Sequence, residues 1–385
     1  MKRWLSNSIY AGFAVLSLTA CQPPVPSEHS QPLVSYVDHT AVKRQAIGNC
    51  WLYAQASWLE SLLKTSTGHE VNVSETYWTY WDFFEKIRGG AELDEEGVFP
   101  TGGQWYRSRE LIQRYGWVEQ QDFQAEEESP EAMSDMQACA KDELSWALHD
   151  GGELSRPEDR TEAHIIKVLD RAFSCSGRYR IDGPHLDAHI HAAKATQVVD
   201  PKTRVSTDLA TMMQRWNPIA NPAEEPASLG KGLLTRSSRN ALKGLEQRIK
   251  RALNDHQPVV LSFQVSFNAP NDAGVFNLDT LADAREMGHQ GGHMLVLHDY
   301  TVTDAPGFAM LGEGDLPESQ KAAALQGQLE TLVAKNSWGS FRGDRPWLGN
   351  GFSRFTWDYL TARYWDEKSE SFQPFLQDVI LPEGY

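Results

Sequence analysis

The sequence has few cysteines and a shortage of positive charge, and each shortage excludes a class of protein. Four cysteines in 385 residues are too few for a fold built on disulfides, so Cys21, Cys50, Cys139 and Cys175 each need a separate explanation. The 36 Lys and Arg residues are outnumbered by 52 Asp and Glu, which gives a net charge of -16. Such a chain repels phosphate backbones, so we expect no nucleic-acid partner.

The sequence also lacks an apolar run long enough to span a bilayer comfortably. The run Ile9–Leu18 follows Lys2 and Arg3 and precedes small residues, which predicts a signal peptide over residues 1–20. Its end, Leu18-Thr19-Ala20-Cys21, resembles the lipobox of bacterial lipoproteins, in which the signal peptide is removed and the cysteine is acylated. The alternative is an ordinary signal peptide that leaves Cys21 free to pair.

The lipobox resemblance implies a lipid anchor on Cys21, and Gln22 after it favours sorting to the outer membrane. We therefore expect a protein of the bacterial cell envelope that contacts the membrane through its N-terminal lipid. Residues 21–36 include Pro23, Pro24 and Pro26, which predicts an extended tether between that lipid and the fold.

Residues 37–120 have the apolar spacing of helices. Apolar positions between Ile47 and Leu63 recur at helical spacing, which places Cys50 at the N-terminal end of a helix. Ser74 can cap a second helix, and a third is expected over about residues 105–115. Residues 37–120 therefore predict a helical lobe.

The rest of the chain changes character twice. Residues 121–256 combine helical periodicity with polar linkers, which predicts a largely helical insertion. We expect it to pack as its own layer and to contribute to access or assembly rather than to the chemistry. Strand-like runs such as Val259–Phe263 and Met294–Leu297 follow within residues 257–385. Helices first and strands second predict an α+β fold with two lobes.

Cys50 is the candidate nucleophile. A thiol attacks a carbonyl only as thiolate, and at an ordinary pKa of about 8.5 little of it is ionised at neutral pH. A helix N-terminus and a nearby imidazolium would both lower the pKa of Cys50. The sequence therefore predicts a thiol activated by a histidine from elsewhere in the chain.

Four segments resemble papain-like cysteine peptidases, in the family's order: Val42–Trp51, Gly102–Trp105, Gly291–Leu297 and Lys335–Gly339. The second segment and the helix after Ser74 are similar to the bleomycin hydrolase and bacterial aminopeptidase branch. The resemblance implies a papain-like two-lobe fold, a helical lobe plus a β-barrel-like lobe, with the helical insertion between them.

The resemblance also implies a role for each matching residue. Cys50 would be the nucleophile, His293 its base, and Asn336 the residue that orients the imidazole. Gln45 would complete the oxyanion hole, and Trp338 would shield the histidine from water. The substrate cleft would include Trp51, Gly102, Gly103 and Gly292.

The chain departs from the family pattern in three ways. Ile47 stands where the family has a cysteine, so the disulfide made there is absent. Cys50 and His293 are 243 positions apart, against about 130–150 in the family, which requires the insertion. The stretch before Gln45 leaves no room for an inhibitory propeptide, so any latency would come from the insertion or from the residues after Tyr359.

Other histidines have plainer explanations. His289 is expected to be a loop residue and His298 a satisfied polar residue, and the glycines between His289 and His293 would break a helix that aligned them on a metal. A surface helix face is the preferred interpretation of a second group in the insertion. That group is His185, His189 and His191. We therefore expect neither a metal nor another cofactor.

Cys139 and Cys175 could form a disulfide in an oxidising periplasm or stay apart, because the sequence does not set their distance.

The leading functional hypothesis is a cysteine peptidase that hydrolyses peptides or proteins through a thiol acyl-enzyme. A catalytically silent papain-fold binding module and a Cys-His acyl transferase are the alternatives, and no G-x-S-x-G run supports a serine hydrolase. Aminopeptidase action would need a plug, which the residues after the asparagine motif could supply; oligomeric state is left open.

Overall fold

The computed structural model describes residues 37, 39–123, 129–181, 189–222, 236–284, 288–314, 316–339, 351–366 and 369–385, all within the unit Val34–Tyr385. The expected signal peptide, Cys21, the tether and His185 lie outside the described residues. Within the described ranges, no helix has both the length and the apolar character needed to cross a membrane.

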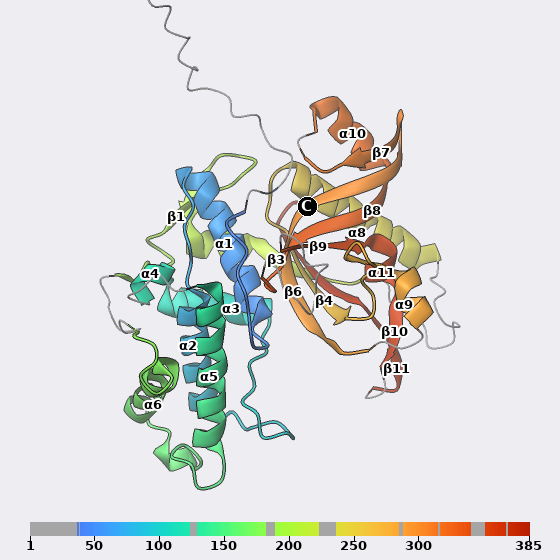
Figure 1. Cartoon of the computed structure of the whole chain (residues 1–385). Helices are drawn as coiled ribbons and strands as arrows, with labels where there is room; N and C mark the ends of the chain where they lie inside the picture. The colour runs from blue at the N-terminus through green and yellow to red at the C-terminus, as the bar shows by residue number, and fades with distance from the viewer. Residues whose placement is uncertain are drawn as a thin grey trace, which may run out of the picture. The chain divides into compact units, whose positions relative to one another are not determined.

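The first part of the described chain is helical, as its apolar spacing predicts. Its helices are α1 (Cys50–Thr67), α2 (Glu75–Arg88), α3 (Trp105–Tyr115) and α4 (Gln120–Phe123), shown in blue to green in Figure 1. The Ser74 side chain accepts the N–H of Tyr77 and caps α2. Every residue of α1 from Cys50 to Leu63 is buried, because α1 packs between the other helices and the sheet.

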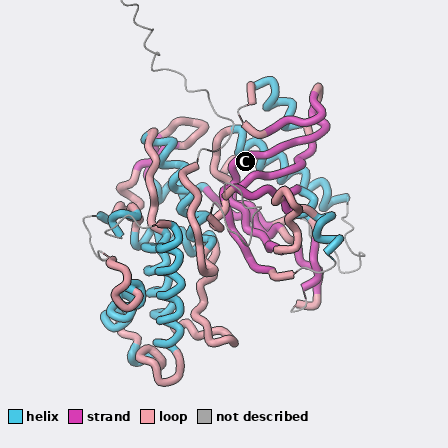
Figure 2. The backbone as a smooth tube through the Cα atoms, in the orientation of Figure 1, coloured by secondary structure: helices cyan, strands magenta, loops and turns pink. Residues whose placement is uncertain are grey.

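The strands after the helices form an eight-stranded sheet in the described part of the chain (Figure 2). Its order is β3-β12-β4-β6-β8-β9-β5, with β7 also paired to β6, and its pairs are antiparallel except β5 with β9. The strands are β3 (Trp216–Ala220), β4 (Val260–Ser266), β5 (Val275–Phe276), β6 (Gln290–Ala305), β7 (Phe308–Gly312), β8 (Gln328–Lys335), β9 (Phe352–Thr356) and β12 (Leu376–Pro382).

Shorter elements complete the fold. Two hairpins stand outside the main sheet: β1 (Gln197–Val199) with β2 (Ser206–Asp208), and β10 (Arg363–Asp366) with β11 (Ser371–Pro374). The remaining helices are α5 (Pro130–Leu148), η1 (Pro157–Asp159), α6 (Glu162–Ser174), α7 (Leu209–Arg215), α8 (Arg236–Asn254), α9 (Leu278–Ala284), α10 (Glu318–Gln326) and α11 (Trp357–Thr361).

The segment 121–256 differs from the expected separate layer, because its apolar faces are divided between the two lobes. Met136 of α5 and Val168 of α6 are buried in the same core as α1 and α2, and a disulfide between Cys139 and Cys175 joins the two helices. Ile249 of α8 is instead buried in the core of the sheet, and β3 pairs with β12. The segment therefore builds both lobes.

The stretch after the asparagine motif also belongs to the sheet. Strand β12 pairs with β3 on one side and β4 on the other. Beyond it, the Tyr385 hydroxyl donates to Asp255, with 2.7 Å between the oxygens. These contacts leave residues 376–385 unavailable as the plug that the aminopeptidase alternative would need.

Candidate active site

Cys50 is the first residue of α1, and the turn before it is well defined. The Asn49 N–H donates to the Ile47 carbonyl at 2.8 Å, and the Leu52 N–H donates to the Asn49 carbonyl at 2.9 Å. The first N–H groups of a helix have no acceptor within it, and that of Cys50 is one of them. The buried thiol is directed at the Gly292 carbonyl of β6, with Sγ and O 3.9 Å apart.

His293 lies on β6 beside that carbonyl and makes the predicted contact with Asn336. Its Nε2 is 2.9 Å from Asn336 Oδ1, and both side chains are buried. The Trp338 ring stacks on the imidazole with centroids 4.7 Å apart and planes 22° apart. Trp338 therefore covers one face of the imidazole that contacts Asn336.

The contacts of Asn336 fix which nitrogen of His293 carries hydrogen. The Ser337 N–H donates to Asn336 Oδ1 at 2.8 Å, and a backbone N–H can only donate, so this atom is the amide oxygen. The amide nitrogen donates to Ser353 Oγ at 2.8 Å. Because Asn336 offers the imidazole an acceptor, Nε2 of His293 must carry hydrogen, and in the neutral imidazole Nδ1 is then the nitrogen that can accept a proton.

Gln45 is held against the turn that leads to Cys50. Its backbone N–H donates to the Ser337 carbonyl at 2.8 Å, and its side-chain Nε2 donates to the Ile47 carbonyl at 2.9 Å. The Ser337 hydroxyl donates to Gln45 Oε1. A primary amide nitrogen has two hydrogens, and the contact with Ile47 uses one of them.

Trp51, the residue after Cys50, explains the glycine at position 103. A Cβ on Gly103 would lie 2.3 Å from Trp51 Cε2, so only glycine fits beside the indole. Trp51 Nε1 donates to the Thr101 carbonyl at 3.2 Å, and Lys86 donates to the Gly102 carbonyl at 2.8 Å. The main chain at Thr101 and Gly102 is thus fixed by hydrogen bonds. Gly102 and Gly103 are exposed to solvent, and so is Gly292 on the sheet lobe.

The pKa of the thiol differs from the sequence-based expectation. Burial raises the pKa of Cys50 to about 11, and the N–H groups of Met294, Trp51 and Cys50 only partly oppose that shift. We expected a lowered value from the helix N-terminus, but the cost of burying a thiolate outweighs it. A thiol with this pKa is protonated at neutral pH.

His289 and His298 lie where the sequence analysis placed them. His191 of the segment 121–256 does not. His289 is exposed and stacks on a phenylalanine, while His298 Nδ1 donates to the Val37 carbonyl at 2.9 Å. His191 was expected on a surface helix, but it forms a β-bridge with Trp117, and the two rings stack 4.2 Å apart. In the described ranges, no group of three His, Cys, Asp or Glu side chains could hold a metal.

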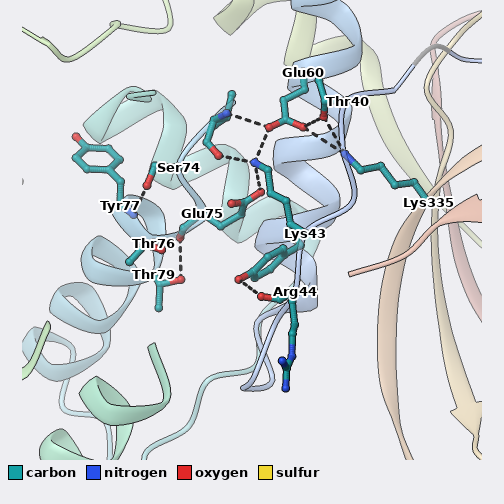
Figure 3. A network of polar contacts seen from close by, with 12 residues as sticks. Thr40, Lys43, Arg44, Glu60, Ser74, Glu75, Thr76, Tyr77, Thr79 and Lys335 are labelled. Atoms are coloured by element: carbon teal, nitrogen blue, oxygen red, sulfur yellow. Dashed lines mark hydrogen bonds and ion pairs between the residues drawn. The ribbon is translucent and has the colours of Figure 1, made fainter. Parts of the chain in front are cut away.

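Sequence reasoning missed a buried ionic network that links the site's segments (Figure 3). Lys43 Nζ lies 2.6 Å from Glu60 and 2.7 Å from Glu75, and Lys335 Nζ lies 3.4 Å from Glu60. Thr40 donates to Glu60 and accepts from Lys335. The sequence does hold a sign of this network, because Glu60 falls within an apolar helix. Lys43 and Lys335 belong to two of the segments that resemble the family.

The network connects Cys50 with the other site residues. Glu60 is on α1, Lys43 stands two residues before Gln45, and Lys335 directly precedes Asn336. Burial alone would raise the pKa of Glu60, but Lys43 and Lys335 hold it below its ordinary value. For Glu75, burial and the charge of Glu60 outweigh Lys43 and raise the pKa to about 7.

The described elements, helices first and a largely antiparallel sheet second, confirm the predicted α+β class. Similar solved structures include PepW from Lactobacillus rhamnosis HN001, at 14% identity and a TM-score of 0.44 over 90% of this chain and 81% of that one.

Two others are the clostridial cysteine protease Cwp84, at 11% identity and a TM-score of 0.35 over 89% of this chain and 54% of that one, and a recombinant stem bromelain precursor, at 14% identity and a TM-score of 0.32 over 89% and 66%. No family model matches the chain, and no curated protein matches it.

Proposed function

We propose that this chain is a cysteine peptidase that hydrolyses peptide bonds through a thiol acyl-enzyme. The observation that carries the proposal is the 2.9 Å contact between His293 Nε2 and Asn336 Oδ1, together with a Cys50 thiol directed at the carbonyl of Gly292, the residue before His293. A nucleophile, a base and a residue that orients the base are the parts that this chemistry requires.

The proposed reaction assigns each step to one group. His293 Nδ1 accepts the thiol proton, and Sγ bonds to the scissile carbonyl carbon, whose oxygen becomes an oxyanion. The Cys50 N–H and the second hydrogen of Gln45 Nε2 stabilise that oxyanion. When the carbon–nitrogen bond breaks, the amine leaves with the proton from His293, and the acyl group stays on sulfur. Water, deprotonated by His293, then hydrolyses the thioester.

The open main chain of residues 101–103 supports peptides as substrates. An extended peptide pairs with an exposed backbone through N–H and carbonyl groups, and glycine allows the closest approach. Gly102 and Gly103 are exposed, and Trp51 and Lys86 fix their backbone. Such contacts recognise a peptide regardless of its side chains.

The proposal is tested with a peptide library offered in two forms, with free and with blocked N-termini. We expect hydrolysis of peptides that stops when iodoacetamide adds one carboxamidomethyl group to Cys50, as mass spectrometry would show. Cleavage of blocked peptides would indicate an endopeptidase, and cleavage of free N-termini alone an aminopeptidase. A folded protein that cleaves no peptide would instead indicate the silent binding module.

The lipobox supports a second part of the proposal, an enzyme held at the bacterial outer membrane by lipid on Cys21. Cys21→Ser removes the acylated atom, so we expect the variant to leave the membrane fraction or to keep its signal peptide. The measurement is fractionation with mass spectrometry of the N-terminal peptide. A wild-type protein that is soluble and carries no lipid would contradict this part alone.

A further inference from the structure

Gln137 belongs to the segment between the lobes, yet its side chain lies next to the active site. It is fully buried on α5, where it contacts α1 and α2. Gln137 Oε1 accepts from Asn49 Nδ2 at 2.8 Å, and its Nε2 donates to Thr76 Oγ1 at 2.9 Å. Asn49 is the residue before the nucleophile.

The orientation of these amides follows from a carbonyl, which can only accept. The Thr79 hydroxyl donates to the Glu75 carbonyl at 2.8 Å, so its oxygen is left to accept from Asn49, 3.0 Å away. The atom of Asn49 that contacts Thr79 is therefore nitrogen, and this nitrogen also contacts Gln137. Gln137 consequently presents its oxygen to Asn49.

The Gln137 side chain is also linked, through Tyr53, to the segment that carries Gln45. The Tyr53 hydroxyl shares its single hydrogen between two acceptors, Gln137 Oε1 at 3.3 Å and the Arg44 carbonyl at 3.0 Å. That carbonyl belongs to the peptide bond between Arg44 and Gln45. One buried amide therefore contacts the residue before Cys50 and, through Tyr53, the residue before Gln45.

We infer that Gln137 is a positioning residue for the oxyanion hole. The inference rests on the proposed function, in which the Cys50 N–H and the Gln45 side chain bind the developing oxyanion. Gln137 fixes the peptide plane that supplies the first donor and, through Tyr53, the chain that carries the second. Donors in an oxyanion hole act only when held in place before the reaction, so loosening them lowers kcat more than it changes KM.

The test compares two probes of Cys50 in wild type and in Gln137→Met, which keeps the side-chain length but removes the hydrogen bonds with Asn49, Thr76 and Tyr53. An N-acetyl dipeptide aldehyde adds the thiol to its carbonyl and places an oxygen in the hole. Iodoacetamide alkylates the thiolate with loss of iodide and uses no oxyanion donor. We expect aldehyde affinity and kcat to fall on the order of tenfold, with KM and the alkylation rate at each pH unchanged.

Leu144→Ala is the matched control on the same helix, because this fully buried leucine lies in the core two helical turns after Gln137 and has no polar side-chain atom that could join its hydrogen bonds. It should lower the melting temperature but leave kcat unchanged below that temperature. Tyr53→Phe removes the hydroxyl that contacts Gln137 and the Arg44 carbonyl, and it should lower kcat several-fold. This variant replaces Gln137→Met as the test if Gln137→Met does not fold.

Gln137→Met with wild-type kcat and aldehyde affinity would overturn the inference. So would an equal fall in the alkylation rate, because the residue would then act on the thiol or on folding. A wild type that hydrolyses no peptide would overturn the proposed function instead, while the comparison of aldehyde with iodoacetamide would still test Gln137. Loss of aldehyde binding in the wild type itself would overturn both.

Discussion

Cys50→Ala is expected to abolish peptide hydrolysis, by a factor of about 10⁴ or more, without changing the fold. The substitution removes only the sulfur from a small buried side chain at the start of α1, and alanine is the best helix former. Cys50→Ser should be equally inactive, because His293 would have to deprotonate a much weaker acid. Peptide turnover and the far-ultraviolet circular dichroism spectrum are the measurements, and full turnover by either variant would remove the mechanism.

His293→Ala should be comparably damaging and should also change the pH dependence of the thiol. Burial raises the pKa of Cys50 to about 11, so without the imidazole the thiol stays protonated until strongly alkaline pH. Alkylation by iodoacetamide should therefore rise towards pH 11 in the variant and occur at lower pH in the wild type. His289→Ala, four residues away and exposed, is the matched control and should behave as wild type. If His289 proved essential and His293 dispensable, the base would be misassigned.

Glu60→Gln should cause the largest loss of stability, about 3–5 kcal/mol, because it leaves two buried lysines facing one remaining carboxylate. Glu60 also accepts the Val73 N–H at 2.9 Å, so the loop before α2 loses a bond as well. Urea unfolding measures the change. A loss below about 1 kcal/mol would mean that the network adds nothing beyond an ordinary surface pair.

The control and the pH dependence sharpen this result. Glu70→Gln breaks a mostly exposed pair with Lys64, 2.9 Å apart, and should cost about 0–1 kcal/mol. The pKa of Glu60 is lowered in the folded state, so its stabilisation is complete above its ordinary value of 4.5 and is lost as the pH falls through the lower native value. Glu60→Gln should therefore flatten the acid limb of the stability curve, whereas Glu70→Gln should not.

The local patterns of the sequence were sufficient for the helices of the first lobe and for the relation between His293 and Asn336. Ser74 caps α2 as predicted, and the His293 contact follows from two short segments with recognisable residues. These predictions rest on neighbours in the chain or on a family resemblance. The function that the site performs stays a proposal.

The features that sequence reasoning missed depend on contacts between distant residues. Gln137 and Asn49 are 88 positions apart, and a glutamine on a helix ordinarily faces solvent, so nothing local marks it as buried. The raised pKa of Cys50 has the same origin, because desolvation depends on how closely α1 packs on β6. His191 pairs with Trp117 across the fold rather than continuing a helix.

The chain leading into the site is clamped at two points before it reaches Gln45. The Val37 N–H donates to the His298 carbonyl at 3.1 Å, and His298 Nδ1 donates back to the Val37 carbonyl. Further on, Thr40 and Lys43 are bound to Glu60. A mechanical pull on the residues before Val37, such as a membrane tether would transmit, is resisted by β6 and then by α1. Such a pull would therefore load these two attachments before it reached Gln45.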